Sequence, residues 1–303
     1  MMKDSAIRFG GLILILAASF IGAEAQSRRN SAVTIDAEGT ILSVVASRTT
    51  ASKEPIKPEN VFLYENGIEQ KIKNFSFDPS PAKIVILADN SLTVRADLDA
   101  LKKAAMEFAY EIFDGDQLFI VGYDEKPEII QEWTDDAKKI AASLGTFRKK
   151  GNAFLFDSLN ATMNEILLPL MPGTRKTAVV LISDGLDRGS KTTFDKLLGE
   201  LQNQNITVYA LQIPDRTGGA YRRNQPKAGQ VIEQLAEGTG GKVFPIEEAN
   251  AAAKFICDEL KRNRYLLSYS PVNTSSYDAK RVFLIADEGI SIRTKNLQPP
   301  NVK

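Results

Sequence analysis

The 303-residue chain contains no histidine, and this absence excludes several common kinds of active site. Without histidine there is no Ser-His or Cys-His nucleophile pair, no histidine general base and no histidine-ligated zinc or iron. The chain has one cysteine, Cys257, so it cannot form an internal disulfide. The apolar helical context Phe255-Ile256-Cys257 predicts a core residue rather than a reactive thiol.

An excess of charge of one sign and long apolar runs are also missing. Lys+Arg and Asp+Glu number 38 each, so no overall field favours nucleic acid or an anionic membrane surface, and we expect no nucleic-acid partner. The apolar run Gly11–Gly22 is shorter than the roughly 20 residues that span a membrane. It follows Lys3 and Arg8 and precedes Ala23-Glu24-Ala25, the pattern of a secretory signal.

We therefore expect residues 1–25 to be a cleaved signal peptide. The mature chain would be exported to the periplasm or outside the cell, without stable membrane insertion after signal cleavage. An uncleaved membrane anchor is the alternative interpretation of the same segment.

Residues 26–80 show the pattern of a small antiparallel β unit. Strand-like runs at Val61–Tyr64 and Ile68–Phe77 flank Asn66-Gly67, a strong signal for a hairpin turn. The proline-containing segment Asp78-Pro79-Ser80-Pro81 predicts a linker after this unit.

Residues 81–264 alternate between strand and helix patterns, which is typical of a parallel α/β sheet. We predict a Rossmann-like, mostly parallel sheet with helices on both faces. The strand-like segment 265–303 should then join the N-terminal unit in one accessory antiparallel sheet. The expected strands of the α/β part are 84–88, 117–122, 128–133 at an edge, 177–183, 207–213 and 242–244, and the expected helices are 97–113, 135–144, 154–168, 192–203, 230–237 and 247–263.

Polar oxygen-bearing residues follow one of the predicted buried strands at regular spacing. In KIVILADNSLT the apolar run ends at Asp89, and Ser91 and Thr93 follow it. A second apolar run, TAVVLIS, ends directly before Asp184. Because parallel strands place ligands at their carboxyl ends, these groups should meet at one sheet edge. One carboxylate and two hydroxyls suit Mg²⁺ or Ca²⁺ rather than zinc, although a polar turn is the alternative.

The runs ILADNSLT and LISDGLD, with the alternation between them, resemble a von Willebrand factor type A domain with its metal-ion-dependent adhesion site. The flanking runs VTIDAEGTILSVVA, NVFLYENGIEQKIKNFSFD and YLLSYSP resemble exported von Willebrand factor A-related proteins frequent in acidobacteria. The resemblance implies a non-enzymatic binding protein. It would capture a protein partner, through an acidic side chain of that partner, with Mg²⁺ (or Ca²⁺ or Mn²⁺) as cofactor.

The resemblance also assigns ligand positions for the metal. Asp89 and Ser91 match the first loop, Thr93 replaces the usual serine with its hydroxyl kept, and Asp184 matches the third loop. Asp89 would carry the dominant charge, and Asp184 would bind directly or through water.

The second loop departs from the family pattern. Ala153 stands where a threonine hydroxyl is usual, so Asn152 is a possible substitute ligand. Leu92 replaces a common glycine. Asp187, close to Asp184, is expected to be a surface residue or the start of a helix cap.

Two other functions fit parts of the pattern. A metal-independent scaffold could make its contacts through the β unit and the loop Asp215–Ala228, which carries basic side chains at Arg216, Arg222, Arg223 and Lys227. A haloacid-dehalogenase-like phosphatase would also place an aspartate at a strand end, but it needs a second acid where this chain has Ser91. No G-x-G-x-x-G run supports dinucleotide binding.

Overall fold

The computed structural model describes residues 39–300, except 53, 172, 216–224 and 275–276. The chain divides into two compact units, Met1–Ser31 and Ala32–Lys303, and every described residue lies in the second. The predicted signal peptide and most of the basic loop after Asp215 lie outside the described residues. Among the described helices, none combines the length and apolar character that a membrane span requires.

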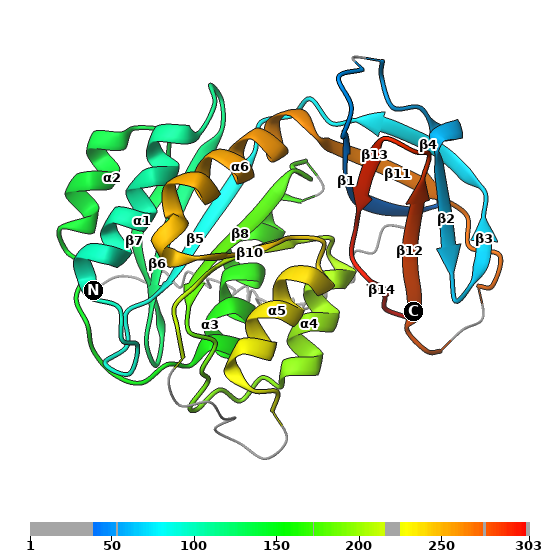
Figure 1. The fold of residues 1–303 in the computed structure, drawn as a ribbon. Helices are drawn as coiled ribbons and strands as arrows, with labels where there is room; N and C mark the ends of the chain where they lie inside the picture. Colours follow the sequence, from blue (N-terminus) through cyan, green and yellow to red (C-terminus); the bar gives the residue numbers. More distant parts are fainter. Residues whose placement is uncertain (1–38, 53, 172, 216–224, 275–276, 301–303) are drawn as a thin grey trace, which may run out of the picture. The chain divides into compact units, whose positions relative to one another are not determined.

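A six-stranded sheet forms the centre of the α/β part (Figure 1). Its strands are β5 (Lys83–Asp89), β6 (Gln117–Tyr123), β7 (Pro127–Thr134), β8 (Thr177–Ser183), β9 (Thr207–Gln212) and β10 (Val243–Pro245). The spatial order is β10-β9-β8-β5-β6-β7. All neighbours pair in parallel except β6 and β7, which are antiparallel. The predicted Rossmann-like sheet is confirmed, with β7 at one edge.

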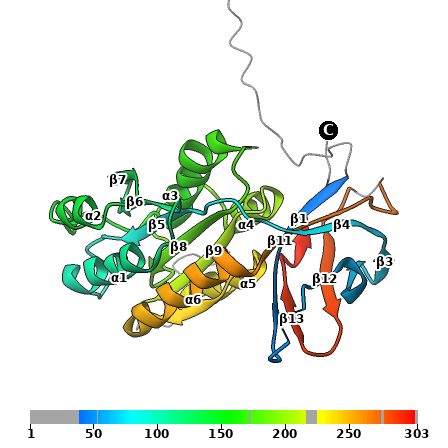
Figure 2. The ribbon, with the colours of Figure 1, turned by 90° about the horizontal axis from the view of Figure 1, so that it is seen from above.

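Helices cover both faces of this sheet (Figure 2). One face packs against α1 (Leu98–Glu111), α2 (Ala137–Leu144) and α6 (Ala249–Arg262). The other packs against α3 (Leu155–Ala161), α4 (Phe194–Asn203) and α5 (Ala228–Gly238). The strands are apolar throughout because both of their faces are covered. Cys257 is buried on α6, so its predicted place in the core is confirmed.

Local signals explain where individual helices begin. The Asp97 side chain accepts a hydrogen bond from Ala100 N at the start of α1, and Asp136 caps α2 in the same way. Such caps satisfy amide groups that have no partner in the first helical turn. The predicted helix 154–168 forms as α3 followed by a π-helical turn, η2 (Thr162–Leu167), and a 3-10 turn, η3 (Leu168–Leu170). Two further 3-10 turns are η1 (Pro58–Asn60) and η4 (Ile246–Glu248).

The accessory strands form two sheets, so the prediction of one accessory sheet is wrong. These strands are β1 (Thr40–Arg48), β2 (Val61–Glu65), β3 (Ile68–Gln70), β4 (Ile72–Phe77), β11 (Arg264–Tyr269), β12 (Lys280–Ala286), β13 (Ile290–Arg293) and β14 (Leu297–Gln298). They are ordered β13-β1-β11-β4 and β14-β12-β2-β3. The predicted strand Ile68–Phe77 breaks at Lys71, and its halves pair with β2 and β11 in different sheets.

The predicted pairing of N-terminal with C-terminal strands is observed. Strand β1 pairs with β11, and β2 pairs with β12, both antiparallel. An apolar cluster that includes Leu42, Leu63, Leu267 and Val282 draws on both sheets. Burying each such side chain stabilises the fold by about 1.5–3 kcal/mol. The division of the chain into domains at 26–80, 81–264 and 265–303 stays a prediction.

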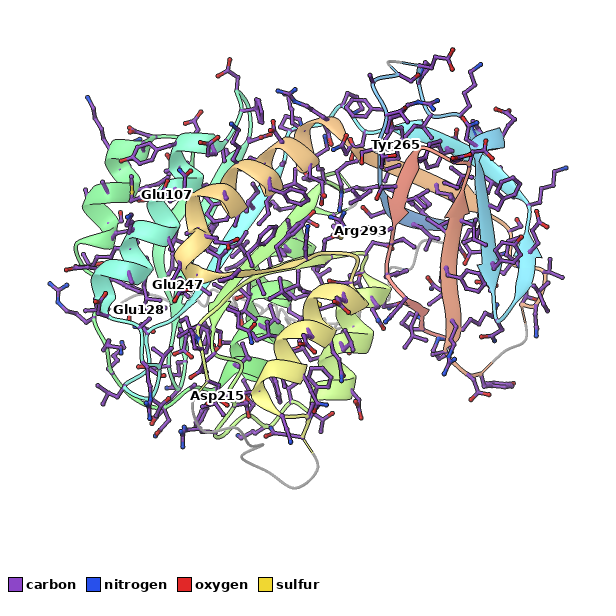
Figure 3. The ribbon with its side chains drawn as sticks, in the orientation of Figure 1. Glu107, Glu128, Asp215, Glu247, Tyr265 and Arg293 are labelled. Carbon is purple, nitrogen blue, oxygen red and sulfur yellow. The ribbon has the colours of Figure 1, made fainter. Side chains whose placement is uncertain are left out.

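Charged side chains near the C-terminus contact the helices of the α/β part. The guanidinium of Arg293, labelled in Figure 3, forms an ion pair with Glu259 on α6 and donates to Gly240 O at 3.0 Å. Lys295 is 3% exposed, and its Nζ donates at 2.7 Å to Gln202 O near the C-terminal end of α4. Burial lowers the pKa of Lys295 from 10.5 to about 7. These contacts join the C-terminal segment to the α/β part of the fold.

Candidate functional site

The candidate site lies where the strand order of the central sheet reverses. After β5 the chain continues to β6 on one side, whereas β8 lies on the other side of β5. In open α/β sheets, ligands bind at the carboxyl ends of the strands next to such a reversal. Asp89 is the last residue of β5 and Ser183 is the last residue of β8. Both polar residues therefore lie at this edge of the sheet.

Asp89 is a fully buried carboxylate with two neutral donors. Its exposed fraction is 0%, Oδ1 accepts from Ser91 N at 2.9 Å, and Oδ2 accepts from the Tyr123 hydroxyl at 3.2 Å. Burial, followed by the negative charge of Asp184, raises the pKa of Asp89 from 3.8 to about 7. The hydrogen bonds from Ser91 and Tyr123 oppose this rise only in part. The carboxylate is therefore in a place that favours a nearby positive charge.

The two hydroxyls of the first loop lie together next to Asp89. Ser91 Oγ and Thr93 Oγ1 are 2.9 Å apart, and Ser91 Oγ also accepts from Val94 N at 3.3 Å. Ser91 is fully buried, whereas Thr93 is half-buried. The structure thus brings together the oxygens of the D-x-S-x-T run. Carboxylate and hydroxyl oxygens are hard ligands of the kind that Mg²⁺, Ca²⁺ and Mn²⁺ accept.

Asp184 adds a second buried acid from the third loop. It is 4% exposed, and its Oδ1 accepts from Leu186 N at 3.0 Å. Burial raises the pKa of Asp184; the charge of Asp215 raises it further and Arg188 opposes it. Asp215 is labelled in Figure 3. The charge of Asp184 is one cause of the raised pKa of Asp89, so the two acids lie within electrostatic range of each other.

Backbone conformation at Gly185 shapes the third loop. Its φ is +83°, and an added Cβ would lie 2.2 Å from Ala228 O at the start of α5. Only glycine adopts this conformation at low cost and also allows so close a backbone approach. Position 185, directly after Asp184, therefore requires glycine, because the start of α5 packs closely against its backbone.

The second loop is tied to its neighbours through the backbone. Leu92 N donates to Gly151 O at 3.0 Å, and Arg188 N donates to Ala153 O at 2.8 Å. Ala153 is fully buried and carries no hydroxyl. The Asn152 side chain is exposed, and its Nδ2 donates to Glu125 Oε1 at 3.1 Å. Within the described part of the chain, no hydrogen bond joins Asn152 to the first loop, and its role as a ligand stays a prediction.

Asp187 is buried, so its predicted place on the surface is wrong. It is 3% exposed and accepts from Phe156 N, Ser190 N and Gln225 Nε2, each at 3.2 Å. The Ser190 hydroxyl donates to it as well. Asp187 binds the third loop to the start of α3, because its two oxygens reach amides from both segments. The Asp-x-x-Ser spacing was a local signal for part of this turn.

Sequence reasoning missed Tyr123 and Ser183. The Tyr123 hydroxyl lies 2.9 Å from Ser183 Oγ and also donates to Asp89, while Gly185 N donates to Ser183 Oγ at 3.0 Å. Burial raises the pKa of Tyr123 well above its ordinary value, so the phenol keeps its proton. The available signal was its position: Tyr123 ends β6 in register with Asp89, the end of the neighbouring strand.

The donor set of the site fits a hard divalent cation but not zinc. It contains two acids, Asp89 and Asp184, and neutral hydroxyls. In the part of the chain that the structure describes, no group of three or more His, Cys, Asp or Glu side chains is arranged to hold a metal ion. Mg²⁺ tolerates such a site because it keeps several waters and needs few carboxylates.

Comparison with known proteins finds a match between part of the chain and a sequence family. Residues 84–186 match the family described as von Willebrand factor type A domain. The match runs from the start of β5 to the loop after β8, so it includes both Asp89 and Asp184. A search of curated proteins found no match.

Several solved structures are similar to the chain. An aerotolerance-related membrane protein from Bacteroides fragilis has 17% identity and a TM-score of 0.46, over 60% of this chain and 99% of that one. The protein BatB from Bacteroides thetaiotaomicron has 18% identity and a TM-score of 0.44, over 60% of this chain and 98% of that one. A von Willebrand factor type A protein from Catenulispora acidiphila has 12% identity and a TM-score of 0.48, over 85% of this chain and 73% of that one.

Proposed function

We propose that the chain, whose residues 84–186 match the von Willebrand factor type A domain family, is an exported binding protein that captures a protein partner through a divalent cation. The observation that carries the proposal is the buried Asp89 carboxylate, which has a second acid, Asp184, within electrostatic range and two loop hydroxyls beside it. A cation at this edge would relieve the repulsion between the two acids and satisfy the hydroxyl oxygens.

Four residues would hold the cation. Asp89 supplies the main charge, Ser91 and Thr93 supply neutral oxygens, and Asp184 acts directly or through water. Water can fill the position that Ala153 leaves without a hydroxyl, because Mg²⁺ commonly keeps several waters. Asn152 is a further candidate, and Ca²⁺ or Mn²⁺ could replace Mg²⁺.

The bound cation would supply positive charge that attracts a ligand from outside. Two acids at most offset the dication, and if Asp184 acts through water the site keeps net positive charge. An acidic side chain of a partner protein is the ligand that this charge favours. Von Willebrand factor type A domains commonly mediate protein–protein interactions, which supports the same class of partner.

Binding without catalysis is the better fit to these residues. A phosphatase of the haloacid dehalogenase type needs a general acid two positions after its nucleophile, and Ser91 stands there. Ser91 is occupied by hydrogen bonds to Thr93 and Val94 N, which position it as a loop-forming oxygen donor.

A metal-independent scaffold is the competing function, and one observation favours it. The Ser91 and Thr93 hydroxyls bond each other at 2.9 Å, so the first loop can satisfy itself without a cation. In a scaffold of this kind, the first loop would be held in shape by hydrogen bonds among Asp89, Ser91 and Thr93.

Thermal unfolding of the chain from Gln26 onward separates the two functions. We expect Mg²⁺, Ca²⁺ or Mn²⁺ to raise the melting temperature relative to EDTA, because a ligand at about 100 times its Kd stabilises the folded state by about 2.7 kcal/mol. Asp89→Ala should abolish this rise, whereas Glu233→Ala, on the exposed side of α5, should keep it. No rise in any of the three ions up to millimolar concentration would favour the scaffold.

Export is tested separately from cation binding. The full chain is expressed in a bacterium with an outer membrane and the cells are fractionated. We expect the protein in the periplasm or medium, with an N-terminus at Gln26 by mass spectrometry. A protein that keeps residues 1–25 and stays with the membrane would instead support the anchor.

A further inference from the structure

Tyr123 connects three neighbouring strands at the candidate cation site. Its backbone carbonyl accepts from Asn90 N at 3.0 Å, and its hydroxyl bonds both Asp89 on β5 and Ser183 on β8. Strand β5 lies between β6 and β8, and adjacent strands are about 4.8 Å apart. The side chain therefore extends across the end of a whole strand. A tyrosine is long enough for this, whereas serine or threonine at the same position is too short.

The hydrogen bonds around Tyr123 run in one direction. Gly185 N can only donate, and it donates to Ser183 Oγ at 3.0 Å. The ionised Asp89 carboxylate, which is the form that binds a cation, can only accept, and it accepts from Tyr123 at 3.2 Å. Ser183 and Tyr123 have one hydroxyl proton each and lie 2.9 Å apart, so Ser183 donates to Tyr123. Neighbouring bonds in such a chain polarise and strengthen one another.

This chain of hydrogen bonds sets the orientation of Asp89. Ser91 N holds Oδ1 and Tyr123 holds Oδ2, so a donor on each oxygen resists rotation of the carboxylate. Each carboxylate oxygen has about two lone-pair positions and thus retains acceptor capacity for a cation. Removing the Tyr123 hydroxyl would leave Oδ2 without this donor in a fully buried position.

The second loop does not supply an equivalent hydroxyl at Ala153. That side chain is buried in the same apolar cluster as Tyr123. The polar group that contacts Asp89 from this cluster is instead the Tyr123 hydroxyl, at the end of β6.

We propose that Tyr123 is a positioning residue of the cation site: its hydroxyl fixes the Asp89 carboxylate for cation binding and links it to the loop that carries Asp184. This inference rests on the proposed cation-binding function. It predicts that a phenol that never touches the cation nevertheless sets the affinity for it.

Manganese binding to matched tyrosine variants tests the inference. Tyr123→Phe removes the hydroxyl and keeps the ring. Tyr209→Phe is the control, because Tyr209 is also fully buried and also donates to a carboxylate, Glu259 at 2.5 Å, outside the site. Mn²⁺ affinity is measured from the electron paramagnetic resonance signal of the free ion. We expect Tyr123→Phe to raise the Kd about 10- to 100-fold and Tyr209→Phe to leave it unchanged.

Mn²⁺ binding should also change the absorption spectrum of Tyr123. Saturating Mn²⁺ should give a tyrosine difference spectrum in the near ultraviolet, because the cation withdraws charge from the carboxylate that Tyr123 binds. The difference spectrum should be lost in Tyr123→Phe and kept in Tyr209→Phe. A purely structural role would lower the melting temperature of both variants without this contrast.

The possible results separate the inference from the proposed function. If the wild type binds Mn²⁺ and Tyr123→Phe binds it equally well, the positioning role is wrong and the cation site stands. If the wild type binds no Mn²⁺, both are wrong. Ser183→Ala, which breaks the chain one bond earlier, should weaken Mn²⁺ binding less than Tyr123→Phe, and the reverse order would also overturn the inference.

Discussion

Replacing Asp89 by asparagine should stabilise the cation-free protein at neutral and alkaline pH. The pKa of Asp89 rises from 3.8 to about 7 on folding, chiefly through burial. At about 1.4 kcal/mol per pH unit, this rise of roughly 3 units corresponds to about 4 kcal/mol of lost stability once the carboxyl is ionised. Asparagine has the same shape without the charge, but its amide accepts through one oxygen only. We therefore expect a net gain of about 2–4 kcal/mol in the free energy of unfolding.

The sign of the pH dependence follows from the same rise. Between pH 4 and 7 the folded state keeps a proton on Asp89 that the unfolded state has released. The stability contributed by this proton is complete below about pH 4 and is lost as the pH rises through about 7. In EDTA, the wild type should lose this stability over that range, and Asp89→Asn should not. Saturating Mg²⁺ should reverse the order at pH 8, because the cation binds the ionised wild type and not the variant.

Urea unfolding followed by circular dichroism, at pH 4 to 8 and with EDTA or Mg²⁺, measures these differences. Glu233→Gln, an exposed substitution on α5, is the control for the loss of one negative charge. Equal pH profiles for wild type and Asp89→Asn in EDTA would refute the argument that a buried, repelled carboxylate weakens the cation-free fold. A stability difference that persists unchanged at pH 4 would refute the ionisation as its cause.

Four further substitutions test the packing around the site and the accessory sheets. Gly185→Ala forces a side chain into φ +83° and to 2.2 Å from the backbone of α5, so it should lower the free energy of unfolding by at least about 2 kcal/mol. Gly199→Ala, in α4 with open space around it, should raise that energy by about 0.5–1 kcal/mol. Urea unfolding of both variants checks this, and equal effects would contradict it. Arg293→Ala leaves Glu259 buried without its cation and should lower stability by about 3 kcal/mol in thermal unfolding, whereas a loss below about 0.5 kcal/mol would show that the ion pair is dispensable. Because burial lowers the pKa of Lys295 to about 7, wild-type stability should gain a component between pH 7 and 10 that Lys295→Met lacks, and parallel pH profiles of the two proteins would count against it.

The agreement between sequence and structure is best where short-range patterns decide the backbone. The run KIVILAD is apolar because both faces of β5 are covered, and this pattern is visible without knowing what covers them. Asn66 and Gly67 adopt φ values of 48° and 81°, the left-handed conformations that their residue types favour in a hairpin turn. Parallel strands end at one edge of a sheet, so the meeting of Asp89 and Asp184 could also be predicted.

The disagreements lie where distant segments meet. The run Ile68–Phe77 has one strand-like pattern, but its halves pair with β2 and β11, and the position of β11 is decided more than 180 residues later in the chain. Asp187 reads as a surface acid, yet the start of α3 covers it. Local composition does not encode which remote surface will bury a given residue.

By itself, the sequence determined the α/β class of this protein, the order of its elements and the acids and hydroxyls at the carboxyl edge of the sheet. It did so because side-chain periodicity and backbone preferences act over a few residues. Only the tertiary structure decided that Tyr123 reaches across β5 to Asp89, that the accessory strands form two sheets, and that burial raises the pKa of Asp89. These features depend on distances and solvent exclusion between segments that are far apart in the chain, and such quantities exist only after folding.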